Sequence, residues 1–382
     1  MKILHLLYES KGDYFGIGGV GIRAYEIYGR LRQRHDITLL CRSYPGAVDG
    51  LIEGLRHIFV GAQSKNFLKA LLSYAYHASL YVRRHGREYD VIVEEFSPAV
   101  PMFLGSYRDR PLVLQVQGHT GKQYFDKYSM FYAAPLYLME KYRVIAYRNV
   151  IFVSEAAKAR YRLKNNCNAT VISNGISESL LEDAPECCNL STSHQPPYIL
   201  YLGRIDIHHK GLDVLLGGYE GLCSVFPEIG LIIAGNGRDM GKLTSMLKDL
   251  PDTVRNNIQC TGWVDGQRKA ALLKDALFVV APSRYETQNI VVLEALACGK
   301  AVVVSGIPEL QYAVNCGAGL SFVSENTRAL TAAMQQLITE GRSKGLIEEM
   351  GVKGRQWVSD YTWDRVASAY EKYLHDSVQL SL

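Results

Sequence analysis

The chain has 382 residues, of which 48% are hydrophobic and 21% charged, and its net charge is +4. This composition excludes a disordered or collagen-like chain and a disulfide scaffold, and the length favours two domains. None of the eight cysteines lies in a Cys-x-x-Cys pair, which is typical of reduced thiols. Met1–Tyr8 indicates a strand rather than a signal peptide, and no apolar run is long enough to span a bilayer. We therefore expect a cytoplasmic protein.

Positive charge is concentrated in the first half of the chain. Residues 1–183 carry 24 Lys and Arg against 17 Asp and Glu, a net charge of +7. Two basic patches contribute, and their members are Arg83, Arg84 and Arg87, then Lys141, Arg143, Arg148, Lys158, Arg160, Arg162 and Lys164. They are either solvated helix faces or a surface for an anionic acceptor or acidic lipid, with peripheral contact at the inner face of a membrane. No nucleic-acid motif accompanies the charge, so nucleic acid is not an expected partner.

Apolar runs alternate with amphipathic stretches along the chain. The runs expected to form strands are Lys2–Tyr8, Ile37–Cys41, Val91–Val93, Leu112–Val116, Val150–Val153, Tyr198–Leu202, Gly230–Ala234, Asn257–Cys260, Leu277–Ala281 and Ala301–Val304. Helical periodicity lies between them, at Arg23–Arg34, Phe67–Arg84 and Leu212–Phe226. Near-continuous apolar strands alternating with helices indicate parallel sheets covered on both faces, which is the α/β, doubly wound class.

One segment interrupts this alternation. Residues 184–197 have no periodicity and contain three prolines, so they are expected to form a linker. The linker separates two α/β domains, residues 1–183 and 198–360. An aromatic, helical segment follows at residues 361–382.

A glycine-rich segment, Gly16–Gly21, satisfies the pattern GxGxxG. It does not directly follow its strand, because Glu9–Phe15 intervenes, so dinucleotide binding is the less favoured interpretation. A glycine loop that opens a helix presents backbone N–H groups to a phosphate or a sugar. Gly18 and Gly19 are therefore candidate contacts, and a purely structural turn is the alternative.

Two cations, Arg204 and Lys210, follow the strand expected at Tyr198–Leu202. We expect Lys210 to begin a helix, which is an unfavourable end for a cation unless an anion binds there too. The Arg fork and the Lys point charge together suit a diphosphate. Two solvated surface charges are the alternative.

Two glutamates, Glu286 and Glu294, flank the start of a helix expected from about Asn289 to Gly299. Eight helical residues span ~12 Å, whereas paired glycosidase carboxylates lie roughly 5–9.5 Å apart. The two glutamates are therefore expected to make separate contacts with one ligand. The free N–H groups of Thr287 to Ile290 offer an anion or hydroxyl site between them.

With these motifs the chain resembles the retaining glycosyltransferases of family 4, which have the GT-B fold, and Glu286 and Glu294 match the E-x7-E signature of that family. Other segments similar to the family's motifs are Gly18–Gly21, Ile172–Ile176, Leu202–Arg204, Lys210–Gly211, Ala234–Gly237, Thr261–Val264 and Tyr361–Asp364. The resemblance implies two Rossmann-like domains facing across a cleft. The first would bind the acceptor and the second the nucleotide sugar, and the last helix would cross back to the first.

The resemblance also implies an activity, which is metal-independent transfer of a hexose from a UDP- or GDP-sugar to a polysaccharide or lipid-linked saccharide, with retention of configuration. Arg204 and Lys210 would neutralise the leaving phosphate, and Glu286 would contact the transferred sugar. The implied donor-binding residues are Gly18, Gly19, Gly203, Gly235, Gly262, Val264, Thr287, Gln288, Asn289, Ile290 and Glu294. No cofactor or metal is expected. Alternatives are a nucleotide-sugar epimerase, a nicotinamide dehydrogenase and a non-catalytic nucleotide-sugar-binding protein.

The chain departs from the family pattern at two places. After Glu286 the family usually has Gly-Phe-Gly, whereas Thr287–Asn289 here offers side-chain donors that should change which sugar hydroxyls are bound. The family's histidine after the strand at Leu112–Val116 is replaced by Gln117, and His119 follows, so either could position the sugar or acceptor. Tyrosines of the first half are expected mostly in the core, with some stacking on sugars. They are Tyr74, Tyr76, Tyr81, Tyr124, Tyr128, Tyr132, Tyr137 and Tyr142.

Overall fold

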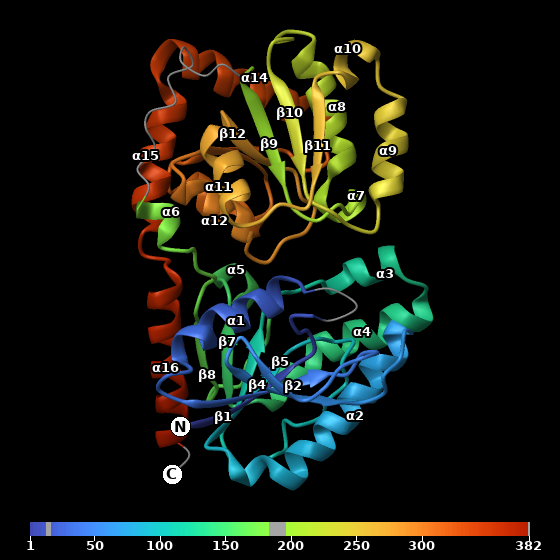
Figure 1. Ribbon diagram of the computed structural model, residues 1–382, viewed down its shortest axis with the longest axis vertical. Helices are drawn as coiled ribbons and strands as arrows, with labels where there is room; N and C mark the ends of the chain where they lie inside the picture. Colours follow the sequence, from blue (N-terminus) through green and yellow to red (C-terminus); the bar gives the residue numbers. More distant parts are fainter. Residues whose placement is uncertain (13–16, 183–195, 381–382) are drawn as a thin grey trace. The chain divides into compact units, whose positions relative to one another are not determined.

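The computed structural model describes residues 1–12, 17–182 and 196–380. It contains two compact units, one formed by Met1–Gly175 with Trp363–Leu382 and the other by Ile176–Thr362. Each unit is a largely parallel sheet with helices on both faces, which confirms the predicted α/β, doubly wound class (Figure 1). Of the predicted linker 184–197, only the last two residues lie within the described part of the chain.

The N-terminal sheet has the strand order β3-β4-β2-β1-β5-β6-β7-β8 within the described residues. The strands are β1 (Lys2–Leu7), β2 (Asp36–Arg42), β3 (Gly50–Ile52), β4 (Leu55–Val60), β5 (Val91–Glu95), β6 (Leu112–Val116), β7 (Asn149–Phe152) and β8 (Asn168–Val171). All neighbours are parallel except the hairpin of β3 and β4. The strand order reverses between β1 and β5, and in such sheets ligands bind beside the carboxyl ends at this point.

Helices cover both faces of this sheet. They are α1 (Gly19–Leu31), α2 (Phe67–His85), α3 (Tyr124–Lys127), α4 (Met130–Arg143), α5 (Glu155–Lys158) and α16 (Trp363–Gln379). Helices α1 and α16 lie side by side and share one apolar core with the sheet, while α2 packs in a second core on the other face (Figure 1). Helix α16 buries Val366, Tyr370 and Leu374, whose spacing of four residues places them on one helix face.

The C-terminal sheet has the order β11-β10-β9-β12-β13-β14 within the described residues, and its neighbours are parallel. The strands are β9 (Tyr198–Leu202), β10 (Gly230–Ala234), β11 (Ile258–Gly262), β12 (Phe278–Ala281), β13 (Ala301–Ser305) and β14 (Gly319–Phe322). The helices are α6 (Ser179–Glu182), α7 (Ile207–Lys210), α8 (Leu212–Cys223), α9 (Met240–Lys248), α10 (Asp252–Arg255), α11 (Gly266–Asp275), α12 (Ile290–Ala297), α13 (Gln311–Asn315), α14 (Thr327–Lys344) and α15 (Leu346–Val358).

Two buried clusters, one on each face, hold this sheet between its helices. Helices α8 and α14 pack on one face, and α12 and α15 contribute to the other. The carboxyl ends of β9, β10, β11 and β12 consequently meet at one edge of the sheet, where the loops that follow them come together. Among the described residues, no helix combines the length and the hydropathy that crossing a membrane requires.

Candidate active site

The carboxylate of Glu286 is the centre of a hydrogen-bonded group at the carboxyl edge of the C-terminal sheet. Its Oε1 accepts from Lys210 Nζ at 2.6 Å, from Ser283 Oγ at 2.7 Å and from Asn289 Nδ2 at 2.9 Å. Within the described residues, the hydrogen bonds recorded for this carboxylate all end on Oε1. The Glu286 side chain is only 7% exposed. Lys210 and Glu286, which were predicted separately from two motifs, are therefore in direct contact.

Opposing influences act on the charge of Glu286. Burial favours the neutral carboxyl, but the Lys210 ammonium and the hydrogen bonds from Lys210 and Ser283 outweigh it and hold the pKa of Glu286 below its ordinary value. The group is therefore an ionised carboxylate at neutral pH. An anion with a half-buried cation beside it can stabilise positive charge on one side and negative charge on the other.

The position of Lys210 differs from the prediction. It is the last residue of α7, and Gly211 in the left-handed conformation separates it from α8. Asp206 caps the start of α7 by accepting from the His209 backbone N–H. Because α7 has only four residues, its macrodipole is too small to decide where a cation lies. Lys210 is held by its contact with Glu286 instead. Arg204 is exposed, directly after β9, and its carbonyl accepts a hydrogen bond from the Tyr201 hydroxyl at 2.8 Å.

Three predicted glycines bring neighbouring loops close together at this edge. Gly203 N donates to the carbonyl of Ala234, and Gly235 N donates to the carbonyl of Gly262 at 2.8 Å. A Cβ on Gly235 would lie 1.8 Å from the Gly203 carbonyl oxygen, and Gly235 has a φ of +146°. Only glycine fits there, so the loops after β9, β10 and β11 form one connected rim.

The second glutamate of the predicted signature, Glu294, lies within α12 and pairs with a residue that the sequence analysis missed. Lys269 Nζ of α11 contacts Glu294 Oε1 at 2.6 Å. Val264, predicted in the base-binding turn, is buried ahead of α11. Lys269 carried no spacing signal, although it lies five residues after Val264 on the next helix.

The loop Thr287–Asn289, which stands where the family has glycines, is hydrogen-bonded to α12. Asn289 is the N-cap of α12 and its side chain accepts from the N–H groups of Val291 and Val292. Its amide also donates to Glu286. Both ends of this amide therefore make contacts within the chain, and one N–H of its NH2 group is left for a sugar hydroxyl. Thr287, Gln288 and Ile290 lie beside it, and Gln288 is buried.

The predicted glycine loop of the N-terminal unit already holds an anion from the chain itself. Helix α1 begins at Gly19, within the predicted glycine-rich segment, and Glu9 Oε2 accepts from Gly18 N at 2.8 Å and from Gly21 N at 3.0 Å. Burial raises the pKa of Glu9 although these N–H groups oppose it. A Cβ on Gly19 would meet nothing within 4 Å, so open space remains there. Gly16 lies outside the described residues.

Gln117 follows β6, and a buried carboxylate of the neighbouring strand orients it. Gln117 Nε2 lies 3.2 and 3.3 Å from the two oxygens of Glu95, which ends β5. Glu95 also accepts from Gln115 and lies 3.3 Å from His5 Nε2. Because the Gln117 amide nitrogen is bound inward, its carbonyl oxygen is the end available to a ligand. Glu95 was not predicted.

His119 is held by a second buried carboxylate, Glu140 of α4. Glu140 accepts from the backbone N–H groups of Thr120 and Gly121 at 2.7 and 2.5 Å, and it lies 3.6 Å from His119 Nε2. The His119 ring packs edge-to-face against Tyr161. Both candidate positioning residues are therefore part of ordered polar groups beyond the carboxyl end of β6.

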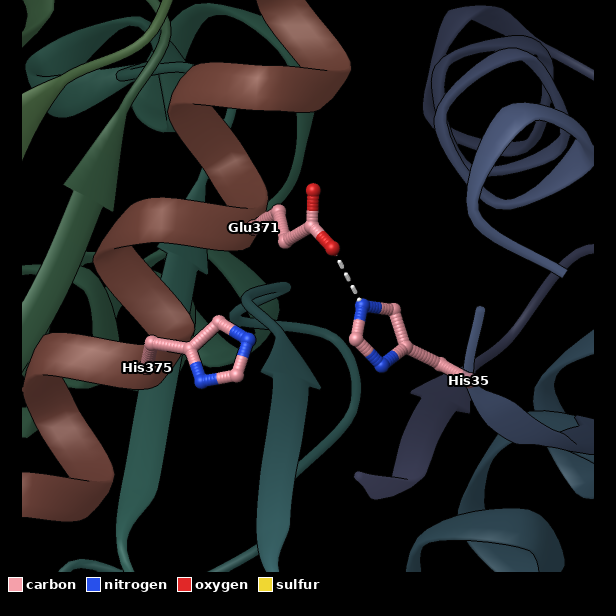
Figure 2. Close-up of side chains that lie close together, drawn as sticks. All are labelled: His35, Glu371 and His375. Atoms are coloured by element: carbon pink, nitrogen blue, oxygen red, sulfur yellow. Dashed lines mark hydrogen bonds and ion pairs between the residues drawn. The ribbon is translucent and has the colours of Figure 1, made fainter. Parts of the chain in front are cut away.

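A group of potential metal ligands, His35, Glu371 and His375, was not predicted (Figure 2). Figure 2 shows that Glu371 and His375 come from α16 and approach His35, whose Nε2 lies 2.6 Å from Glu371 Oε1. His35 Nδ1 faces the Met1 ammonium at 3.1 Å, so both ring nitrogens are already engaged. Arg34 also pairs with Glu371 at 2.9 Å. These neighbouring cations disfavour a bound metal. The group instead makes polar contacts that connect α16 with the residues after α1.

A hollow of about 740 Å³ lies elsewhere in the N-terminal unit, at the amino ends of β6, β7 and β8. Its lining includes Arg108, Arg110, Arg148 and Asn168. Gln117 and His119 lie beyond the carboxyl end of β6, at the opposite edge of the sheet. The hollow therefore plays no part in the candidate site.

Two family models match the chain. The model described as Glycosyltransferase Family 4 matches residues 17–180, and the one described as Glycosyl transferases group 1 matches residues 196–340. With sheets and helices arranged as described above, these matches define a GT-B glycosyltransferase.

Similar proteins agree with this class. A phosphatidyl-myo-inositol mannosyltransferase of Mycobacterium leprae is 30% identical over 220 residues, which is 57% of this chain and 56% of that protein. The chain thus spans about half the length of the curated relatives it matches. The sucrose-phosphate synthase of Thermosynechococcus elongatus superimposes with a TM-score of 0.79 at 19% identity over 98% of both chains. Anabaena HepE in complex with UDP and glucose gives 0.73 at 18% identity, covering 98% of this chain and 100% of that one. In its matched segments and its fold, the chain is thus similar to the glycosyltransferases of family 4.

Proposed function

We propose that the chain transfers a hexose from a nucleotide-sugar donor to a saccharide or lipid-linked acceptor, with retention of configuration and without a metal. The observation that carries this proposal is the contact between Lys210 and Glu286, at 2.6 Å, at the carboxyl edge of the C-terminal sheet. A surface charge pair with no ligand would not need the convergent hydrogen bonds from Ser283 and Asn289. The solved complexes of HepE contain UDP, glucose or UDP-glucose, which favours a UDP-sugar as the first donor to test.

In the proposed reaction, the bond between the anomeric carbon and the diphosphate oxygen breaks while the acceptor hydroxyl oxygen bonds to the same face of that carbon. The acceptor proton passes to the leaving phosphate oxygen. Lys210 and Arg204 neutralise the charge that develops on this phosphate. Glu286 stabilises the positive charge at the anomeric carbon, or accepts from a sugar hydroxyl through Oε2, to which no described donor is directed.

The remaining residues bind or position the substrates in this proposal. Glu294 accepts hydrogen bonds from the ribose, and Lys269, which now pairs with it, either turns aside or contributes a further donor. The loops at Gly203, Gly235, Gly262 and Val264 surround the nucleotide. Gln117 and His119 position the sugar or the acceptor. The relative's name, a phosphatidyl-myo-inositol mannosyltransferase, favours a lipid-linked acceptor and hence a reaction at the cytoplasmic face of a membrane.

A thermal-shift panel tests donor binding. UDP-, GDP-, ADP- and TDP-sugars are added without metal to the wild type and to Lys210→Ala, since a ligand of the folded state raises the melting temperature. We expect a rise with one nucleotide class, lost in Lys210→Ala. Arg108→Ala, in the hollow at the other sheet edge, is the control and should keep the full shift. No shift with any nucleotide sugar, or a shift that survives in Lys210→Ala, would contradict the proposed donor site.

A second measurement separates the transferase from its rivals. A nucleotide-sugar epimerase would convert the donor when no acceptor is present, and a non-catalytic binding protein would give a thermal shift without product. The proposed enzyme should consume donor at a significant rate only when an acceptor is added.

A further inference from the structure

Helix α4 exposes its apolar side chains. Phe131, Pro135, Leu138 and Tyr142 recur at intervals of four, three and four residues, so they form one stripe along the helix. All four are exposed, including 89% of Phe131, 51% of Leu138 and 54% of Tyr142. Exposed Met130 and Tyr132 lie beside the first of them. We call these six residues the α4 face.

The opposite side of α4 carries buried, charged side chains that are bonded to the rest of the unit. These contacts fix the rotation of the helix, so the α4 face stays exposed. Glu140 accepts from two backbone N–H groups of the loop after Gln117. Arg143 pairs with buried Glu94 and donates to the carbonyls of Ser97 and Val100. A helix that buries two of its three charged side chains and exposes aromatic ones is unlike an ordinary surface helix. Contiguous apolar surface of this kind marks an interaction site.

One residue of the predicted basic patches is not at the surface. Arg143 was counted among them, but it is buried and paired with Glu94, so it does not contribute surface charge. Lys141 is exposed, and its ammonium lies 5.3 Å from the ring centre of Tyr142 and 5.8 Å from that of Tyr137. Lys122, before α3, is exposed as well. Lys141 therefore provides positive charge beside the α4 face.

The tyrosines also differ from the prediction of mostly core positions. Tyr74 and Tyr124 are buried as expected, whereas Tyr76, Tyr128, Tyr132 and Tyr142 are exposed. Tyrosine has an apolar ring and a polar hydroxyl, which suits the boundary between lipid headgroups and acyl chains. With 14 residues, α4 is ~21 Å long and would lie in this boundary rather than cross a bilayer.

We propose that the α4 face inserts into the interfacial layer of an anionic membrane, with Lys141 contacting acidic headgroups. The inference deepens the proposed function, because it rests on a lipid-linked acceptor and names the surface that brings the enzyme to it. The net charge of +7 over residues 1–183 complements an anionic bilayer. A second copy of the chain is the alternative occupant of this face, and the measurements below distinguish it from a membrane.

Vesicle sedimentation tests this surface. Wild type, Phe131→Ser/Leu138→Ser and a matched control are mixed with phosphatidylcholine vesicles that contain or lack phosphatidylglycerol. The control, Val225→Ser/Val352→Ser, also replaces two exposed apolar side chains, both outside the N-terminal unit. We expect wild type and control to bind only the anionic vesicles. The α4 variant should bind roughly a hundredfold more weakly, about tenfold for each side chain lost.

Further measurements distinguish a loss of membrane binding from a loss of folding or of donor binding. Lys141→Glu should weaken binding to anionic vesicles and remove part of its salt sensitivity. All variants should keep the wild-type melting temperature and the donor-induced shift, so failure of donor binding and failure of membrane binding remain distinguishable. Equal binding by wild type and the α4 variant, or no vesicle binding by wild type, would overturn the proposal. A concentration-dependent dimer that Phe131→Ser dissolves would also overturn it, in favour of a second copy.

Discussion

Single carboxylates hold the candidate residues in place. Glu286 fixes Lys210, Glu95 fixes Gln117, and Glu140 fixes the loop that carries His119. Each acts through charge-assisted hydrogen bonds, which are shorter and stronger than neutral ones. These candidate groups are therefore already oriented without a ligand.

Glu95 is predicted to position Gln117. Glu95→Gln removes the charge that holds the Gln117 amide, so the amide can rotate and its carbonyl oxygen is no longer presented to the ligand. We expect kcat to fall about tenfold, the effect of ~1.4 kcal/mol, with a smaller change in KM. Steady-state kinetics of Glu95→Gln, Gln117→Ala and the double variant measure the effect.

The double variant is the decisive case. If Glu95 acts through Gln117, the double variant should be about as impaired as Gln117→Ala alone, because the two residues are coupled. Additive losses would contradict a positioning role and indicate that Glu95 acts only on the fold through its contacts with His5 and Gln115. Urea unfolding of each variant shows how far stability contributes.

At the residue scale, residues that belong to motifs with fixed spacing could be predicted from the sequence. The individual residues that contact them could not. Glu286, Glu294 and the pair Arg204 and Lys210 were found from their places after strands and along one helix. Lys269 and Glu95 belong to no spacing pattern, and their contacts come from neighbouring strands or helices. The one signal for Glu95 was an acidic residue at the end of the apolar run Val91–Val93, where carboxyl ends of strands hold ligands.

At the scale of elements, the rim formed by the loops after β9, β10 and β11 depends on glycine. A Cβ on Gly235 would lie 1.8 Å from the Gly203 carbonyl oxygen, so the loops must separate. Gly235→Ala should lower the free energy of unfolding by about 2–4 kcal/mol. It should also weaken donor binding. Urea unfolding and the donor thermal shift measure the two effects.

Gly241→Ala is the matched control. Gly241 lies in α9, and a Cβ there meets nothing within 4 Å. Its replacement by alanine should leave stability unchanged or raise it by about 0.5–1 kcal/mol. A Gly235→Ala protein as stable as this control would show that the rim tolerates separation of the loops.

Strands that are buried on both faces were predictable, because they form continuous apolar runs. All ten predicted strands exist, with small differences at their ends. The strands β3, β4, β8 and β14, which lie at or next to an edge of their sheet, were missed. In β4 the run is broken by His57, which is buried because its ring nitrogens contact the Tyr25 hydroxyl and the Leu55 carbonyl. In β8 the four residues are only half-buried, so the hydrophobic pattern is weak.

At the scale of the whole molecule, the chain passes from one unit to the other at Gly175/Ile176 and again at Thr362/Trp363. The two passages are adjacent, since Ile176 N donates to the Tyr361 carbonyl at 2.8 Å. The predicted boundary at residue 183 relied on composition, which reports prolines and weak periodicity but not which unit a segment contacts. How the two units face one another stays a prediction.

Trp363 should be essential to the N-terminal unit. It is buried, begins α16 and lies so close to Gly175 that a Cβ there would approach its ring to 2.7 Å. Trp363→Ala should destabilise this unit by roughly 3–5 kcal/mol, because a large cavity forms. Trp263→Ala, at an exposed position, is the control. Equal unfolding curves for the two variants would contradict the structural role of α16.

The most direct test of the account is the configuration and rate of sugar transfer. The protein is incubated with the donor that stabilises it and with saccharide and lipid-linked acceptors, and the anomeric configuration of the product is measured by NMR. We predict the configuration of the donor in the product, and a rate roughly 10²–10³-fold lower in Glu286→Gln, as when a transition-state contact is removed. An inverted product, or transfer that Glu286→Gln leaves unchanged, would contradict the central role of Glu286 and Lys210.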